Sequence, residues 1–197
     1  MKRVKKNHPM MSAAVLAMVA AAAVACSSSS ATTAATNSSH DKTAKASLAV
    51  GSQVNSLLQS GLTQADKKNW SAATTTFKKV LAISPSNIYA DYDLGWIAQS
   101  TGNSNGAISY YTKALAANAS YTPAMYNEAI ILEASHPQEA IAVYQKIVSI
   151  DPKASSAYLR LALVQAELGD TTAAKANDAK AISLDPALSK YKLPAKN

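Results

Sequence analysis

A seven-residue phrase that begins with lysine occurs four times between residues 79 and 186. It reads KVLAISP at 79–85, KALAANA at 113–119, KIVSIDP at 146–152 and KAISLDP at 180–186. The four lysines are separated by 34, 33 and 34 residues. A period of this size indicates a chain built from one repeated supersecondary unit, because a single unit of that length cannot bury its apolar face without a neighbour.

Two series of small residues follow the same period. The first series is Gly61, Gly95, Ala129 and Ala162, and the second is Ala73, Ala107, Ala140 and Ala174. Large residues recur four positions after the alanines of the second series, at Phe77, Tyr111 and Tyr144. This is the spacing of neighbours on one face of an amphipathic helix. Small residues let two helices approach closely, so each unit is predicted to be a pair of packed helices, in units near 54–87, 88–121, 122–154 and 155–188.

This pattern resembles the tetratricopeptide repeat (TPR), a helix-turn-helix unit of about 34 residues. In the second unit the matching residues are Leu94-Gly95, Gly102, Ala107, Tyr111 and Ala114. The resemblance implies an all-α fold, a right-handed α-solenoid of about four repeats. It also implies a concave groove, lined by the first helix of each repeat, that binds peptides or protein segments.

Two departures from the repeat carry information. The third unit is one residue short, and the turn at 135–138 is the predicted place, since a deletion inside a helix would rotate a whole face. His136 is therefore interpreted as a turn residue and not as a metal ligand. In the fourth unit Asp178 occupies the aromatic position, which is interpreted as the polar outer face that a terminal repeat needs.

The amino terminus is typical of an export signal. Four basic residues lie within 2–6, and 10–25 is an uncharged, alanine-rich run. The sequence Ala23-Val24-Ala25-Cys26 resembles the lipobox of bacterial lipoproteins, which implies that Cys26, the single cysteine, carries the lipid. Two alternatives stay open: secretion without lipid, and an uncleaved apolar anchor.

These features divide the chain into four parts. Residues 1–25 are predicted to be a signal peptide, and 26–46 a lipidated cysteine with a disordered linker rich in Ser, Thr and Ala. Such a linker cannot bury enough apolar surface to offset its ordering entropy. The TPR domain is predicted at 47–192, with 47–56 extending its first helix backwards, and a tail at 193–197. Whether the linker is glycosylated stays open.

The composition does not favour an enzyme. The glycines are isolated, the carboxylates are scattered, and His136 is the only histidine within the repeats. No catalytic residue, metal or cofactor is expected. Four of the 19 basic residues lie in the signal, so the exported chain has 15 basic and 12 acidic residues, and nucleic acid is not an expected partner.

Helical phase predicts which side chains line the groove. The predicted set is Asn55, Leu58, Leu62, Tyr89, Tyr92, Asp93, Trp96, Gln99, Tyr126, Asn127, Ile130, Glu133, Leu159, Arg160 and Leu163. The candidate partner-binding residues are Tyr89, Tyr92, Trp96, Tyr126, Asn127 and Arg160, because aromatic and Arg side chains are the favoured anchors of binding surfaces. The alternative is that the aromatic stripe is core. One subset of the TPR family grips a carboxy-terminal carboxylate with a clamp of Lys and Asn side chains in this groove. The lysines of such a clamp are missing from the first helices here, so a carboxylate clamp is not predicted.

The sequence therefore predicts a membrane-anchored TPR lipoprotein that acts as a scaffold or adaptor in the bacterial cell envelope. It would bind an unidentified peptide or protein segment in the groove. It would be exported and held by lipid on the outer face of the cell membrane or on the outer membrane. The alternatives are a self-associating structural envelope protein and a secreted TPR module without lipid.

Overall fold

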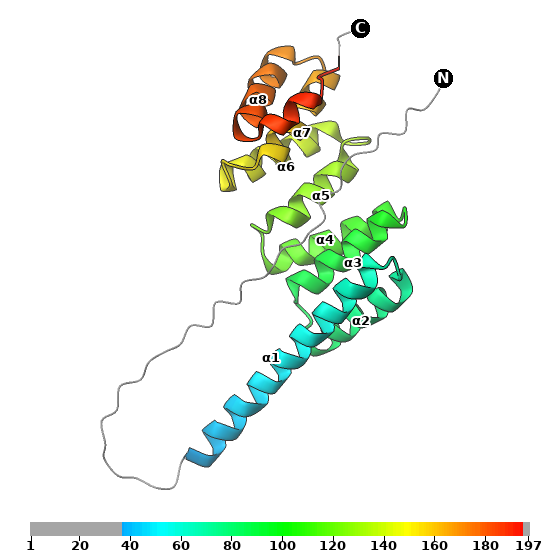
Figure 1. Cartoon of the computed structure of the whole chain (residues 1–197), viewed down its shortest axis with the longest axis vertical. Helices are drawn as coiled ribbons and strands as arrows, with labels where there is room; N and C mark the ends of the chain where they lie inside the picture. The colour runs from blue at the N-terminus through cyan, green and yellow to red at the C-terminus, as the bar shows by residue number, and fades with distance from the viewer. Residues whose placement is uncertain (1–36, 195–197) are drawn as a thin grey trace, which may run out of the picture.

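The computed structural model describes residues 37–194, and all the regular secondary structure in this part of the chain is helical (Figure 1). Its elements are α1 (Asn37–Asp66), α2 (Trp70–Ile83), α3 (Ile88–Ser100), α4 (Ser104–Ala117), α5 (Thr122–Leu132), α6 (Pro137–Ile150), α7 (Ser155–Glu167), α8 (Thr171–Leu184) and the short 3-10 helix η1 (Pro186–Lys190).

Consecutive helices pack as pairs, and the pairs stack. Each pair, α1 with α2, α3 with α4, α5 with α6 and α7 with α8, forms one repeat. We call α1, α3, α5 and α7 the first helices and the other four the second helices. Each second helix packs on the first helix of the following repeat, and α3 also contacts both α1 and α5. Figure 1 shows the resulting staircase from α1 to α8, which confirms the predicted all-α solenoid of four repeats.

The turns use the residues that the sequence predicts. Gly102 and Gly169 have positive φ angles of 84° and 88°, the left-handed conformation that ends a helix at low cost for glycine. The residues that follow, Asn103 and Asp170, cap α4 and α8 by accepting hydrogen bonds from backbone N–H groups. In the first repeat the same left-handed position is held by Lys68, with φ of 57°.

Within each repeat a small residue lies against a large one. A methyl group added at Gly95 would lie 2.5 Å from Cε1 of Tyr111, and one at Gly61 would lie 2.7 Å from Cε1 of Phe77. Phe77, Tyr111 and Tyr144 are completely buried. The glycines are therefore required because the aromatic ring of the second helix occupies the space of a side chain.

A polar bridge joins the two helices of every repeat. In the middle repeats a tyrosine hydroxyl donates to the first helix, and in the outer repeats, where Phe77 and Asp178 have no hydroxyl, the preceding residue does so. The bridges are Thr76 to Gln64 (2.8 Å), Tyr111 to Gln99 (2.7 Å), Tyr144 to Glu133 (2.7 Å) and Asn177 to Gln165 (2.8 Å).

The first helix begins earlier than predicted. It starts at Asn37, so residues 37–46 are helical where a disordered linker was predicted. Adding residues to an existing helix costs little compared with nucleating one. The alanines and lysines at 42–46 are also good helix formers, which outweighs the polar composition. The other predicted boundaries remain predictions, and 1–36 and 195–197 lie outside the described residues.

The second helix of the last repeat, α8, has fewer buried residues than α2, α4 or α6. Only Ala174 and Ala181 are buried on α8. Asp178 is half-buried, and its Oδ1 has no hydrogen-bond partner within residues 37–194. The shortened third repeat is also visible, but the helix is shorter and the turn is not, contrary to the prediction: α5 has 11 residues where α3 and α7 have 13, whereas four residues (133–136) join α5 to α6 and three join the helices of each other pair. His136 lies in the turn before α6, as predicted.

Candidate functional site

Three tyrosines form a stack where α3 meets the start of α5. The rings of Tyr89 and Tyr121 lie 6.1 Å apart, and those of Tyr121 and Tyr92 lie 5.5 Å apart, both edge to face. Tyr89 is 40% exposed, whereas Tyr92 is 5% exposed. The stack therefore runs from the surface to the interior, and Tyr89 is the member that a partner could cover.

Tyr92 is a structural member of this stack. Its hydroxyl accepts a hydrogen bond from Nδ2 of Asn127 (3.2 Å), which joins α3 to α5. Burial, with a smaller effect from Asp93, raises the pKa of Tyr92 to about 12. Tyr92 and Asn127, both candidates for partner binding, are thus bonded to each other across two first helices.

Trp96 lies one turn further along α3 in a different contact. Its ring packs edge to face on Trp70 of α2, with the ring centroids 5.5 Å apart. Trp96 is half-buried, and its Nε1 has no hydrogen-bond partner in the described part of the chain. The structure places this ring in the junction between the first two repeats.

Tyr126 packs within its own repeat and not beside the tyrosine stack. Its ring lies 5.8 Å from that of Tyr144. Burial raises the pKa of Tyr126 to about 12, although Arg160 acts in the opposite direction. The neighbour of Tyr92 on α5 is therefore Asn127, the next residue along the chain.

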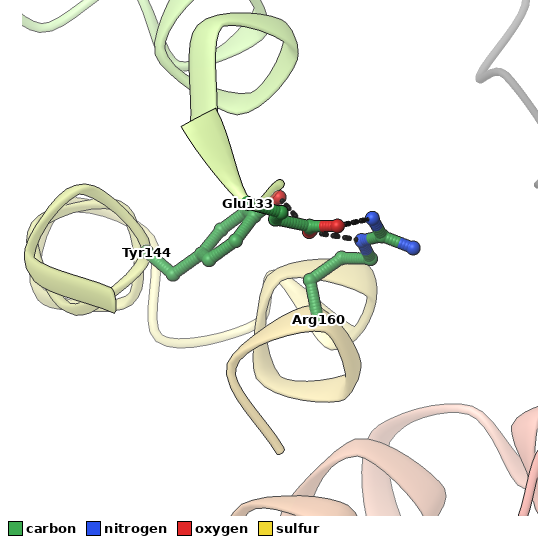
Figure 2. Close-up of polar contacts among 3 residues, drawn as sticks. All are labelled: Glu133, Tyr144 and Arg160. Atoms are coloured by element: carbon green, nitrogen blue, oxygen red, sulfur yellow. Dashed lines mark hydrogen bonds and ion pairs between the residues drawn. The ribbon is translucent and has the colours of Figure 1, made fainter. Parts of the chain in front are cut away.

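Arg160 is engaged in a buried ion pair (Figure 2). Its guanidinium donates from Nε (2.7 Å) and Nη2 to the two carboxylate oxygens of Glu133, at the end of α5. Glu133 also accepts the hydroxyl of Tyr144 from α6. Burial raises the pKa of Glu133, and Arg160 lowers it in part; burial opposes the charge on Arg160, but Glu133 keeps its pKa above the usual value. The carboxylate of Glu133 thereby joins α5, α6 and α7 through hydrogen bonds.

Tyr121 was not predicted to belong to this region, and Asp93 was predicted to line the groove but not to bind a partner. Tyr121 precedes α5 and bridges Tyr89 to Tyr92. Asp93 is 7% exposed, and burial followed by Asp66 raises its pKa to about 7. The only signal for Asp93 was its place in the set predicted to line the groove.

The described part of the chain offers little for catalysis or metal binding. Among residues 46–194, whose side chains the structure describes, no group of three or more His, Cys, Asp or Glu side chains could hold a metal ion. Within the same residues, none of the helices combines the length and the apolar character needed to cross a bilayer. Cys26, the predicted lipid site, lies outside the described residues.

The candidate residues thus fall into separate contacts. Tyr89, Tyr92 and Asn127 belong to one cluster, Trp96 packs with Trp70, and the remaining two lie near Glu133 and Tyr144. These are contacts on or beneath the layer of first helices. The arrangement presents one exposed aromatic ring, that of Tyr89, packed on the ring of Tyr121.

Comparisons with solved structures find helical repeat proteins of the same fold. The chain is 26% identical to MamA, with a TM-score of 0.63 over 75% of this chain and 86% of MamA. It is 23% identical to PilF of Pseudomonas aeruginosa, with a TM-score of 0.65 over 72% and 66% of the two chains. It is 21% identical to YrrB, described as a TPR protein with an unusual peptide-binding site, with a TM-score of 0.60 over 71% and 74%.

Comparison with curated proteins gives no match. The family profile described as tetratricopeptide repeat matches residues 92–155 and 132–187. These segments include α4, α5, α6, α7 and α8, and the structure repeats the same helix pair in α1 and α2. The chain is therefore a tetratricopeptide repeat protein.

Proposed function

We propose that this protein is a non-enzymatic adaptor of the bacterial cell envelope that is tethered to a membrane through lipid on Cys26. Its first-helix layer holds a peptide or protein segment of a partner. The TPR fold supports the general role, because this family builds interaction scaffolds. YrrB, a solenoid of the same fold, is described as having a peptide-binding site.

The observation that carries the proposal is the exposed end of the tyrosine stack. Tyr89 is one of few large apolar side chains left exposed, and its ring is fixed by Tyr121. A rigid aromatic ring gives a large contact area with little loss of side-chain entropy on binding. Tyr92 and Asn127 lie beneath the Tyr89–Tyr121 pair and support it. We therefore do not expect them to contact the partner directly.

Site-specific photo-crosslinking in the native cell tests this proposal. A benzoylphenylalanine in place of Tyr89 is expected to crosslink to one defined protein. The matched control carries the same side chain in place of Ile150, which is 41% exposed at the end of the second helix α6. Equal adducts at both positions, or none at position 89, would contradict binding at the first-helix layer.

The tether is tested separately. A Cys26→Ser variant is expected to leave the membrane fraction, and its amino terminus is expected to lack the mass of the acyl chains. Two or more acyl chains are needed for stable anchoring, so loss of the single cysteine should release the protein. Unchanged membrane association would favour a retained apolar anchor instead.

Self-association is the second candidate function. Leu48 and Val50 are exposed on α1, at 75% and 47%, and could pair with a second copy. Sedimentation at several concentrations distinguishes the two, because an adaptor that binds only its partner remains a monomer throughout.

A further inference from the structure

Successive first helices meet at an equivalent position in three repeats, and the three junctions differ in charge. The position is occupied by Asp93 on α3, Asn127 on α5 and Arg160 on α7, spaced by 34 and 33 residues. Arg160 bonds Glu133, which precedes it by 27 residues, and Asn127 donates to the hydroxyl of Tyr92. Two of the three junctions are therefore closed by a complementary pair.

The junction between α1 and α3 lacks such a pair. Asp66 precedes Asp93 by the same separation of 27 residues (93 − 66) and acts on it electrostatically. Both groups are carboxylates. Burial and, to a smaller extent, Asp66 raise the pKa of Asp93 to about 7, and no Lys or Arg side chain of residues 46–194 lowers it. Between α5 and α7 the Arg160 guanidinium pairs with a carboxylate. Between α1 and α3 no described side chain supplies a cation at the corresponding position.

Asp93 is a buried polar group without a partner. The residue is 7% exposed, and no hydrogen bond or ion pair joins its side chain to residues 46–194. Buried carboxylates are normally paired, so such a group calls for an explanation. Its oxygens are not fully enclosed, because Trp96 Nε1 and Asp178 Oδ1 are the enclosed atoms that lack a partner among the described side chains. Asp93 as a whole residue keeps 7% exposure to solvent.

The surroundings of Asp93 also include aromatic rings. Asp93 contributes to raising the pKa values of Tyr92, Tyr111 and Tyr121, which places the carboxylate within electrostatic reach of the tyrosine cluster. A cation is attracted both by a carboxylate and by the face of an aromatic ring. The alkyl stem of a long basic side chain also packs on apolar surface while its head stays polar.

We propose that Asp66 and Asp93 bind the cationic head of an arginine or lysine side chain from the partner segment, beside the tyrosine stack. This inference rests on the proposed function, since the residue must belong to a segment held by the first-helix layer. Two carboxylates are too few to form a dedicated metal site in this region, where no third ligand is present among the described residues. A basic side chain would give Asp93 the partner that Glu133 gives Arg160.

The test uses the full chain as bait for a displayed library of random twelve-residue peptides at pH 8. The recovered peptides are expected to share one Arg or Lys. A synthetic copy of the best peptide is then titrated by the fluorescence of Trp70 and Trp96, the two tryptophans of the chain. Replacing the shared Arg by citrulline, or the shared Lys by norleucine, is expected to weaken binding at least tenfold, because both replacements keep the stem and remove the charge.

Three variants assign the effect to the carboxylates. Asp93→Asn is isosteric and is expected to weaken the charged peptide at least tenfold while leaving the uncharged peptide unchanged. Asp66→Asn is expected to give a smaller loss, since Asp66 is exposed. Glu139→Gln, an exposed change of the same charge on α6, is expected to have no effect. Far-ultraviolet circular dichroism confirms that each variant is folded.

The outcomes separate the two proposals. Peptides that bind through Tyr89 but need no basic residue, with Asp93→Asn binding equally well, overturn this inference and leave the proposed function intact. Recovery of no peptide removes both. A variant at Asp93 that changes only the self-association of the chain shows that a second copy occupies the junction, which also overturns the inference.

Discussion

Replacing Arg160 by methionine tests how the last two repeats are coupled. The substitution keeps much of the packing and removes both hydrogen bonds from the guanidinium to Glu133. Removing one partner of a buried ion pair typically costs about 3–5 kcal/mol, because the other charge is left uncompensated. The Glu133 side chain is 18% exposed, and Tyr144 still donates a hydrogen bond to it. We therefore expect Arg160→Met to lower the free energy of unfolding by about 2–3 kcal/mol at pH 7.5.

The loss should depend on pH. Burial raises the pKa of Glu133 above its usual 4.5, and removal of Arg160 raises that pKa further. A carboxyl whose pKa is raised by folding favours the folded state below the unfolded pKa and loses that contribution as the pH rises through the folded pKa. The difference between Arg160→Met and the wild type should therefore be smaller at pH 4 than at pH 7.5.

Urea unfolding followed by two signals measures the effect and its location. Circular dichroism reports on all helices, whereas fluorescence reports on Trp70 and Trp96 in α2 and α3. Repeat proteins lose cooperativity when an interface between neighbours is weakened. In Arg160→Met we expect part of the dichroism to be lost before the fluorescence changes, because α7 and α8 separate from the rest of the array.

Two control variants test whether the ion pair between Arg160 and Glu133 couples the last two repeats. Lys146→Met removes an exposed positive charge from α6 and should change stability by no more than about 0.5 kcal/mol. Adding Glu133→Gln to Arg160→Met should restore most of the stability, because the amide oxygen still accepts from Tyr144 and no buried charge remains. If Arg160→Met matches the lysine control, or if its loss is the same at pH 4 and pH 7.5, the ion pair does not couple the repeats.

Three further predictions concern stability and are measured by urea unfolding. Asp93→Asn should stabilise the protein increasingly as the pH rises from 4 to 8, approaching about 4 kcal/mol, because folding raises the pKa of Asp93 to about 7 and its contribution is lost through that range; parallel pH profiles of variant and wild type would contradict this. Gly95→Ala should destabilise by about 1–2 kcal/mol, since overlap with Tyr111 outweighs the gain in helix propensity. The same change at Gly51, where nothing lies within 4 Å, should stabilise by about 0.5–1 kcal/mol. Lys68→Gly should stabilise by up to about 1 kcal/mol, because glycine adopts the positive φ of 57° without strain; a destabilised variant would refute the assignment of strain.

The period of the sequence predicts the architecture because it records contacts that are made inside each repeat. Gly61 and Gly95 had to be small since an aromatic ring lies over each of them, and the turn residues Gly102 and Gly169 had to tolerate a positive φ. Such requirements are local, so they recur with every copy. The composition of 37–46 misled the prediction of the linker, because the helix propagates from residues further along the chain.

The candidate site could be predicted only in part. Helical phase placed Tyr89, Tyr92, Asn127 and Arg160 on the first helices correctly, but phase alone does not distinguish an exposed side chain from one covered by a neighbouring helix. Tyr92 and Arg160 are covered, and Tyr89 is not. Tyr121 was missed because its partners lie on another helix.

The sequence by itself determined the repeat, the helix pairs and their turns, because these depend on residues within about 34 positions of one another. Only the tertiary structure decided which charged positions are paired. Arg160 meets Glu133 across two first helices, whereas Asp93 is influenced by another carboxylate, Asp66, and is paired with no cation in the described part of the chain. Charge pairing is a property of the interface between repeats, and the stacking of those repeats in space fixes it.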